Sequence, residues 1–500
     1  MTVDPPDRAL IEHVHPPGWV NPLAAESYDL VVIGGGTAGL VSAMGAAGLG
    51  ARVALVERHR LGGDCLNTGC VPSKALLRSA RAVGELRKAA AVGVLTGELV
   101  VDFESVMRRM RDRRASIAVN DSALRLERAG VHVFFGEARF LDRRTVGVGG
   151  QSLRFGRAVI ATGGRAAAPP VPGLNDVPFL TNETVFDLTT LPRRLLIVGA
   201  GPIGCELAQA FARFGAAVTL LDQSPRVLPR ESADAAALVE RALGADGVRF
   251  ELGVALVQVT RDDDGIRLHY RREESAPPAL SVVGDGLLVA AGRRPNVEGL
   301  DLETAGVGVD ANGIAVDDRL RTSNRRVYAS GDVCSKFKFT HAAGALSRLV
   351  LQNALFFGRR RVSALVIPWV TYTDPEVAHV GVSEADVRGS HGRLSTITIQ
   401  LSQLDRSVVD DETEGFVSLH HEGGRLRGCT IVAPHAGEII GEAVYALTHG
   451  GSLADLSSTI HAYPTVAEAL RKAGDAYRRQ GLTASRRRWL TRYFEWTRRA

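Results

Sequence analysis

Two cysteines, Cys65 and Cys70, are the residues of this 500-residue chain whose type and spacing best suit chemistry. Four residues separate them in the run GGDCLNTGCVPSK, and a segment that favours helix follows from Ala75 to Leu86. Two thiols at this spacing near a helix start can close a disulfide ring under favourable electrostatics. A buried pair of thiols or half of a metal site is the alternative, but the sequence has no second Cys or His cluster to complete a metal site. We therefore predict a redox-active disulfide and no metal site.

A nucleotide-binding pattern lies in the sequence just before this cysteine pair, and the elements that it predicts must position the pair. A strand from Tyr28 leads into a Gly-x-Gly-x-x-Gly loop, a helix of small residues and a second strand that ends in an acid. The glycines allow a tight turn, the approach of a pyrophosphate and close helix packing, and the acid accepts hydrogen bonds from a ribose. The residues predicted to hold this dinucleotide are Gly34, Gly36, Thr37, Ala38, Gly39 and Glu57.

The same pattern returns 165 residues later, and in both copies the acid follows the first glycine by 23 residues. Two complete units predict two bound dinucleotides. Asp222 ends the second strand of the second unit, where its charge would repel a 2′-phosphate, although Arg226 and Arg230 follow closely and can accommodate that group. The sequence therefore favours NADH over NADPH. The predicted contacts are Gly199, Gly201, Pro202, Ile203, Gly204 and Asp222.

The cysteine segment resembles the family of lipoamide dehydrogenase, glutathione reductase and mercuric reductase, whose motif is Gly-Gly-x-Cys-x-Asn-x-Gly-Cys-x-Pro-Ser-Lys. The resemblance implies that a nicotinamide reduces FAD and that FAD reduces the disulfide. Cys65 is then the interchange thiol that meets the acceptor, and Cys70 is the thiol that lies against the flavin. Lys74 resembles the lysine at the reactive edge of the flavin, paired with Glu206 of the second unit. The other positions that match family contacts are Gly63, Asp64, Ala138, Ala161, Thr162, Gly163, Asp332 and Thr340 for FAD, and Glu206 and Gly292 for NAD(P).

The resemblance also implies the architecture. The expected fold is α/β, with two Rossmann-like dinucleotide-binding domains and a C-terminal α+β domain through which the chain forms a homodimer. The expected boundaries are an N-terminal extension at 1–26, an FAD domain at 27–175 and 298–364, an NAD(P) domain at 176–297, a dimerisation domain at 365–480 and a basic aromatic helix at 481–500.

The sequence departs from the disulfide reductases near its C-terminus. In those enzymes a histidine directly before Pro-Thr acts as acid and base, and a glutamate five residues later orients it. Here Tyr463 occupies the histidine position, whereas Glu468 matches the glutamate. A phenol, with an unperturbed pKa near 10, is a poor base at neutral pH. His461 is the other candidate, although alternate residues of an extended segment point in opposite directions.

This departure leaves the electron acceptor open. Mercuric reductase carries a tyrosine near the same place, so a mercuric reductase-like enzyme that reduces a metal ion or a disulfide is the first interpretation. Dihydrolipoyl dehydrogenase is the alternative within the family. The C-terminal cysteine pair and the amino-terminal Cys-x-x-Cys domain of mercuric reductases are absent from this sequence. A third interpretation is a redox-sensing or membrane-docked NADH:quinone flavoprotein.

Composition sets limits on partners and location. A net charge of +5 is small for this length, so we do not expect nucleic-acid binding. Five scattered cysteines and no signal peptide or membrane-spanning run predict a protein of the reducing cytoplasm. Trp489, Tyr493 and Trp496 recur at helical spacing among arginines. This helix either contacts anionic lipid on the cytoplasmic face or packs on its own dimer, and from sequence we favour the dimer.

Overall fold

A computed structural model of the protein describes residues 4–272 and 280–499. These residues form two compact units. The first, here called the nucleotide unit, comprises Met1–Pro225 and Asp246–Leu365, and the second, the C-terminal unit, comprises Arg226–Ala245 and Val366–Ala500. The residues 226–245 thus group with the C-terminal unit, whereas the boundaries expected from sequence assign them to the NAD(P) domain.

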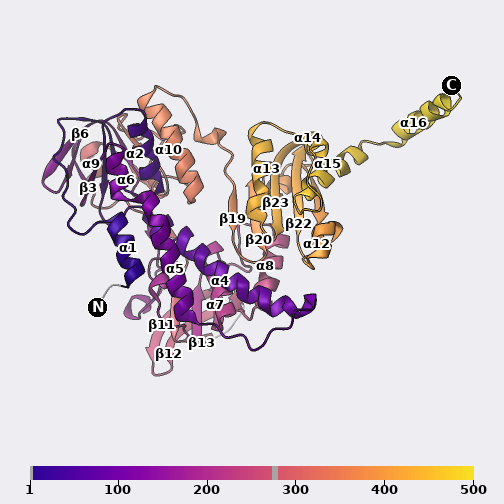
Figure 1. Cartoon of the computed structure of the whole chain (residues 1–500), viewed down its shortest axis with the longest axis horizontal. Coiled ribbons are helices and arrows are strands. Elements are labelled where there is room, and N and C mark those ends of the chain that lie inside the picture. The colour runs from indigo at the N-terminus through magenta and orange to yellow at the C-terminus, as the bar shows by residue number, and fades with distance from the viewer. Residues whose placement is uncertain (1–3, 273–279, 500) are drawn as a thin grey trace. The chain divides into compact units, whose positions relative to one another are not determined.

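The first sheet of the nucleotide unit has seven strands, in the order β3-β2-β1-β6-β5-β4, with β18 paired to β6. The strands β1, β2, β3, β6 and β18 pair in parallel. The strands β1, β2, β3 and β18 and the end of β6 are mainly apolar, as expected for strands covered on both faces. Helices α2 and α10 lie side by side next to this sheet (Figure 1). The bounds are β1 (Tyr28–Ile33), α2 (Thr37–Gly48), β2 (Val53–Glu57), β3 (Val131–Phe135), β4 (Arg139–Asp142), β5 (Thr145–Val148), β6 (Gln151–Ile160), β18 (Val327–Ala329) and α10 (Thr340–Leu355).

A second parallel sheet repeats this design with the order β10-β9-β8-β14, and a three-stranded antiparallel sheet, β11-β12-β13, adjoins it in sequence. Helix α7 follows β8, so that β8, α7 and β9 form the second nucleotide-binding unit that the sequence predicts. The bounds are β8 (Arg194–Val198), α7 (Pro202–Phe214), β9 (Ala217–Asp222), β10 (Arg249–Leu252), β11 (Val254–Asp262), β12 (Gly265–Arg272), β13 (Leu280–Gly284) and β14 (Gly286–Val289).

The remaining elements of the nucleotide unit include the helices that carry the cysteines and a helix near the N-terminus. Helix α1 buries Leu10 and Val14 in the core of the first sheet, so part of the predicted extension belongs to the fold. The bounds are α1 (Pro5–Val14), α3 (Gly63–Asn67), α4 (Cys70–Lys88), α5 (Phe103–Ala118), α6 (Ala123–Arg128), β7 (Gly164–Ala166), β15 (Arg293–Pro295), α9 (Leu302–Ala305), β16 (Val309–Asp310) and β17 (Gly313–Ile314).

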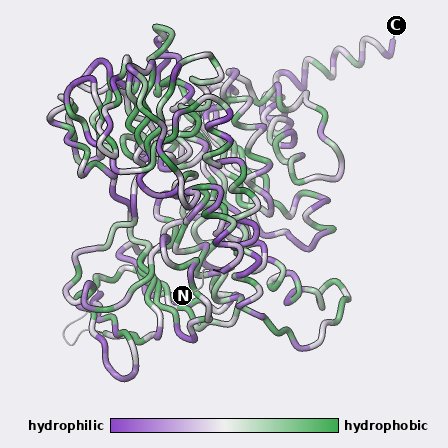
Figure 2. The backbone as a smooth tube through the Cα atoms, turned by 60° about the vertical axis from the view of Figure 1, so that its left-hand side comes forward, coloured by the Kyte–Doolittle hydropathy of each residue, from purple (hydrophilic) through white to green (hydrophobic). Residues whose placement is uncertain are grey.

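The C-terminal unit is built on a five-stranded antiparallel sheet of order β19-β20-β23-β22-β21. Its core includes the apolar faces of α13 and α15. The last helix, which ends at the mark C, is coloured mostly hydrophilic or neutral (Figure 2). The bounds are α8 (Ala233–Ala245), β19 (Trp369–Thr371), β20 (Glu376–Gly381), α11 (Glu384–Gly389), β21 (Ser395–Gln400), α12 (Asp405–Val409), β22 (Phe416–Glu422), β23 (Arg425–Ala433), α13 (Ala436–Thr448), α14 (Leu453–Ser458), α15 (Glu468–Gln480) and α16 (Ala484–Thr497). No helix within residues 4–272 or 280–499 is long and apolar enough to cross a membrane.

Candidate active site

The first glycine loop joins β1 to α2 at very close range. Gly34 has a φ of +108°, and a Cβ atom there would lie 2.3 Å from the carbonyl oxygen of Ala161. A Cβ atom on Gly39 would lie 1.7 Å from the carbonyl oxygen of Gly34, so only glycine lets the helix start this close to the strand. Glu57 accepts hydrogen bonds from the backbone N–H of Gly35 at 2.6 Å and of His59 at 2.7 Å, and burial raises its pKa.

The second glycine loop repeats this geometry at the start of α7. A Cβ atom on Gly204 would lie 1.8 Å from the carbonyl oxygen of Gly199, whereas a Cβ atom on Gly201 would meet nothing within 4 Å. The space at Gly201 is therefore open where a pyrophosphate approaches a helix N-terminus. Asp222 accepts hydrogen bonds from the backbone N–H of Ala200 at 2.6 Å and of Ser224 at 2.7 Å, which fixes its carboxylate at the end of β9.

The two cysteines lie on consecutive helices joined by a short turn: Cys65 lies within α3, and Cys70 is the first residue of α4. Both are free thiols. A hydrogen bond from Cys65 lowers the pKa of the Cys70 thiol to about 6, with further help from the Thr340 hydroxyl and the Lys74 ammonium. The same hydrogen bond raises the pKa of Cys65. The reduced pair thus holds its negative charge on Cys70 and its proton on Cys65.

Two contacts fix the surroundings of that charge. The Thr340 hydroxyl, on the first residue of α10, lies 3.3 Å from the Sγ atom of Cys70. Lys74 lies one turn along α4, and its Nζ atom is 2.8 Å from Oε2 of Glu206, whose side chain is only 6% exposed. An ammonium paired with a buried carboxylate is therefore held beside the thiolate, and the helix N-terminus adds favourable electrostatics there.

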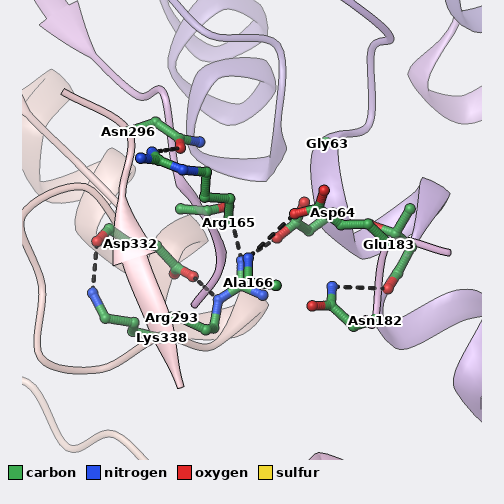
Figure 3. Close-up of polar contacts among 12 residues, drawn as sticks. Gly63, Asp64, Arg165, Ala166, Asn182, Glu183, Arg293, Asn296, Asp332 and Lys338 are labelled. Carbon is green, nitrogen blue, oxygen red and sulfur yellow. Dashed lines mark hydrogen bonds and ion pairs between the residues drawn. The ribbon is translucent and has the colours of Figure 1, made fainter. Parts of the chain in front are cut away.

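An arginine from the end of the second dinucleotide-binding domain connects the cysteine segment to the second flavin-type motif (Figure 3). Arg293 forms an ion pair with Asp64, next to Cys65, and its Nε atom lies 3.3 Å from Oδ2 of Asp332. Burial raises the pKa of Asp332, and Lys338 donates a hydrogen bond to the Asp332 carbonyl at 2.7 Å. The Arg293 guanidinium thus lies between the carboxylates of Asp64 and Asp332 and links the cysteine segment to the second flavin-type motif.

Hydrogen bonds of Asn67 and an ion pair between two distant helices fix the segment between the cysteines. Asn67 donates hydrogen bonds to the carbonyls of Leu61 at 3.0 Å and Gly63 at 2.9 Å. Its own carbonyl accepts from Arg114 of α5 at 2.8 Å, and Arg114 forms an ion pair with Asp7 of α1 at 2.6 Å. Helix α1 therefore contributes to positioning α3, which is a role that the sequence did not indicate.

The C-terminal unit holds the residues predicted to face the interchange thiol. Tyr463 is exposed and donates a hydrogen bond to Oδ2 of Asp405 at 2.8 Å, which raises the pKa of the phenol. The ring of His461 is directed elsewhere, with Nε2 at 3.0 Å from the Glu442 carboxylate. Glu468, at the start of α15, is paired with Arg471 rather than with either ring.

Most of the predicted residues lie in the nucleotide unit, namely both glycine loops and Cys65, Cys70, Lys74, Glu206, Asp332 and Thr340. Tyr463 and Glu468 lie in the other unit. Sequence reasoning missed Asp405, Arg293 and Arg114. Each contacts its partner across a long separation in the chain, and no local motif marks such a contact. No His, Cys, Asp and Glu cluster that could hold a metal ion occurs among the described residues.

Two Rossmann-type units arranged around a low-pKa thiol define a dinucleotide-dependent thiol oxidoreductase. The chain belongs to the pyridine nucleotide-disulphide oxidoreductase family, whose family model matches residues 28–346 and whose dimerisation domain model matches residues 367–474. Members are FAD-dependent enzymes that use NAD(P)H, and the dimerisation domain indicates a homodimer.

Individual relatives carry different names. The chain is 33% identical over 449 residues to a mercuric reductase of Bacillus cereus, covering 89% of this chain and 71% of the relative. It is 35% identical to a dihydrolipoyl dehydrogenase of Thermus scotoductus, covering 91% and 99%. Among solved structures, the Cu(II) complex of the HOCl-induced flavoprotein disulfide reductase RclA from Escherichia coli matches with a TM-score of 0.79 and 26% identity, covering 90% of this chain and all of that one.

The residues present fit FAD. The tight loop at Gly34 and the ribose-type acid Glu57 suit the adenosine half of the molecule. The ion pair of Arg293 with Asp332 offers polar groups for the chain that runs toward the cysteines. The backbone at Gly36 and Gly63 approaches so closely that a Cβ atom on Gly63 would lie 2.7 Å from the Gly36 Cα atom, which leaves this stretch without side chains.

Proposed function

We propose that this protein is an NADH-dependent, mercuric reductase-like flavoenzyme whose Cys65 and Cys70 dithiol reduces a soft metal ion, with Hg(II) and Cu(II) as the test substrates. The observation that carries the proposal is the combination of a stabilised Cys70 thiolate with Tyr463 where disulfide reductases have a base. The first favours thiol chemistry at neutral pH. The second disfavours a reaction that needs a base.

The proposed electron path has three parts. Bound FAD would supply the two-electron link between NADH and the Cys65 and Cys70 disulfide. The protein then keeps the resulting charge on Cys70, beside Thr340 and Lys74, and the proton on Cys65. Reduction of Hg(II) to Hg(0) takes those two electrons, re-forms the sulfur–sulfur bond and releases the remaining thiol proton to solvent.

The identity of the residue at 463 separates metal from disulfide acceptors. A disulfide acceptor leaves as a thiol and must receive a proton, which the histidine of disulfide reductases supplies. A metal ion needs no such proton. The Tyr463 hydroxyl already donates a hydrogen bond to Asp405, and this hydrogen bond, together with the negative charge of Asp405, raises the pKa of the phenol. We propose that Tyr463 of the partner subunit completes the site by contacting the metal, with Glu468 of the partner subunit nearby.

The coenzyme is proposed to be NADH. Both carboxylate oxygens of Asp222 accept hydrogen bonds from backbone N–H groups, so this acidic side chain is fixed where a 2′-phosphate would lie. The guanidinium of Arg226, one of the two arginines that could compensate, donates instead to the carbonyls of Pro229 at 3.2 Å and Glu231 at 3.1 Å.

The second candidate is dihydrolipoyl dehydrogenase. It is favoured by the Thermus scotoductus relative, to which the chain is 35% identical over nearly its whole length. It is disfavoured by Tyr463 and by Glu468, because the glutamate that would orient a base is paired with Arg471.

The deciding experiment is an acceptor panel with Hg(II), Cu(II), lipoamide, glutathione disulfide and a quinone, each run with NADH and NADPH. The wild type is compared with Tyr463→His and with Tyr463→Phe, which keeps the ring and removes the hydroxyl. We expect the highest kcat/KM with a metal ion and NADH, a loss of metal reduction in both variants, and a gain of lipoamide turnover in Tyr463→His alone.

High lipoamide turnover by the wild type would overturn the metal proposal in favour of dihydrolipoyl dehydrogenase. Rapid quinone reduction with slow turnover of every metal and disulfide would instead support the quinone-type interpretation. Equal kcat/KM with NADH and NADPH would refute the role given to Asp222.

A further inference from the structure

The last helix, α16 (Ala484–Thr497), carries side chains that the proposed reaction does not use. No residue of α16 is buried. Its large aromatic residues remain between 45% and 67% exposed, although they are among the most apolar surfaces a side chain can offer. The helix stands clear of the sheet of its own unit (Figure 1). An exposed aromatic surface of this kind usually marks an interaction site.

The aromatic residues form a stripe along one face of α16. Trp489, Tyr493 and Trp496 follow one another at spacings of four and three residues, which places them on the same side of a helix. The rings of Trp489 and Tyr493 stack with centroids 5.8 Å apart, and Trp496 lies 6.3 Å from Tyr493. Leu490 and Phe494 widen this face on one side. Tryptophan and tyrosine prefer the membrane–water interface, where the ring is apolar and its polar edge stays hydrated.

The positive charge of the protein is concentrated in this segment. The whole chain has 60 Lys and Arg against 55 Asp and Glu, and residues 481–500 contain six arginines and one glutamate. Without that segment the counts are 54 and 54, so the other 480 residues are formally neutral and the C-terminal 20 carry the entire net charge of +5. Such a segment has the charge complementary to an anionic surface.

The arginines are placed around the aromatic stripe rather than within a pairing network. Arg488 and Arg492 form a row about 100° around the helix from Trp489 and Tyr493, and Arg487 lies beyond the other edge of the apolar face. Long arginine side chains can extend from such positions to phosphate groups while the rings enter the headgroup layer.

We propose that α16 docks the protein onto membranes that contain anionic phospholipid. A second copy of the chain fits less well, for two reasons. The family's dimerisation domain model matches residues 367–474, and α16 lies outside that match. Two α16 helices packed on each other would also bring together two segments of net charge +5, which repel. These two arguments favour lipid over the dimer.

Flotation with vesicles tests the proposal in the dimeric holoenzyme. We expect the full chain to float with equimolar phosphatidylcholine and phosphatidylglycerol vesicles and not with phosphatidylcholine alone. A chain ending at Leu482 should stay unbound with both and keep its NADH turnover. Raising the salt to about 1 M, where the Debye length falls to about 3 Å, should release the full chain.

Substitutions separate a lipid-binding helix from an unspecific basic tail. Replacing Arg487, Arg488 and Arg492 with glutamine should weaken binding on the order of 100-fold, at roughly fivefold per arginine. Trp489→Ser with Trp496→Ser should also abolish flotation, although it leaves the charge unchanged.

A matched control replaces three exposed arginines elsewhere, Arg113, Arg128 and Arg261, with glutamine. This variant should float like the wild type. Equal flotation of the full and shortened chains would overturn the proposal. A second result would also overturn it: the full chain does not bind vesicles, and the chain without α16 sediments as a monomer. The helix would then serve subunit packing.

Discussion

The Thr340 hydroxyl is the contact through which the stabilisation of the Cys70 thiolate can be tested most cleanly. Thr340→Val removes the hydroxyl that lies 3.3 Å from Cys70 Sγ and keeps the shape of the side chain. Thr340→Ser keeps the hydroxyl and serves as the control. A hydrogen bond to a charged group contributes about 1.5–3 kcal/mol, and the long contact to sulfur places this one at the low end.

A loss of about 1.5 kcal/mol corresponds to a rise of roughly one unit in pKa. The pKa of Cys70 should therefore move from about 6 to roughly 7. The sign follows from the charge: the hydroxyl stabilises the thiolate, so its removal favours the protonated thiol. At about pH 6 the thiolate fraction should fall from about one half to about one tenth, and alkylation of Cys70 should slow about fivefold.

The assay is alkylation of the reduced holoenzyme by iodoacetamide as a function of pH, with mass spectrometry to distinguish Cys70 from Cys65. Thr340→Ser should follow the wild-type profile. If Thr340→Val and Thr340→Ser give the same profile as the wild type, the hydroxyl does not stabilise the thiolate. If Cys65 rather than Cys70 reacts as the low-pKa thiol, the distribution of charge within the pair is wrong.

Three further predictions concern the nucleotide unit and the C-terminal sheet. Gly201→Ala should raise the KM for NADH without lowering the thermal midpoint, because its methyl group enters open space at the pyrophosphate position. Gly204→Ala should instead lower the thermal midpoint, since its methyl group would lie 1.8 Å from a backbone carbonyl oxygen. Arg293→Met should leave Asp64 and Asp332 without their cation and lower the FAD content of the purified protein, measured by absorbance. Burial lowers the pKa of His420 to about 4, so stability should fall by about 3 kcal/mol as the pH drops from about 6.5 towards 4, and His420→Leu should flatten this dependence in thermal melts.

Each of these predictions has a clear contrary result. Equal thermal midpoints for the two glycine variants would show that the helix start at Gly204 can relax around a methyl group. Full FAD retention after loss of the Arg293 guanidinium would remove that residue from the flavin site. An unchanged pH dependence after replacement of His420 would mean that the unfolded-state protonation of this ring does not govern acid stability.

The parts of the fold that the sequence predicted are those governed by local geometry. At Gly39 and Gly204 a Cβ atom would overlap the carbonyl of the glycine five residues earlier. The spacing of the glycines in the sequence therefore predicts the close strand–helix packing that the structure shows. The spacing of Cys65 and Cys70 before a helix is equally local. Helix α1 was not predicted as part of the core, because its two buried residues, Leu10 and Val14, are too few to produce a pattern.

The unpredicted parts of the site depend on contacts between distant residues. Cys70 and Thr340 are 270 residues apart, and Asp64 and Arg293 are 229 apart. The resemblance placed Thr340 among the contacts to FAD, and only the fold shows its side chain at Cys70. The roles assigned to Tyr463 and Glu468 stay predictions, because these residues lie in the C-terminal unit.

The central claim is that electrons leave the protein through Cys65 and Cys70, and counting thiols tests it most directly. The oxidised holoenzyme is reduced with NADH in the absence of oxygen, then denatured and labelled, and the labelled cysteines are identified by mass spectrometry. The account predicts a gain of two thiols, at Cys65 and Cys70, with the labelling of the other three cysteines, Cys205, Cys334 and Cys429, unchanged. Reduction of the flavin by NADH without any gain of thiols at this pair would contradict it.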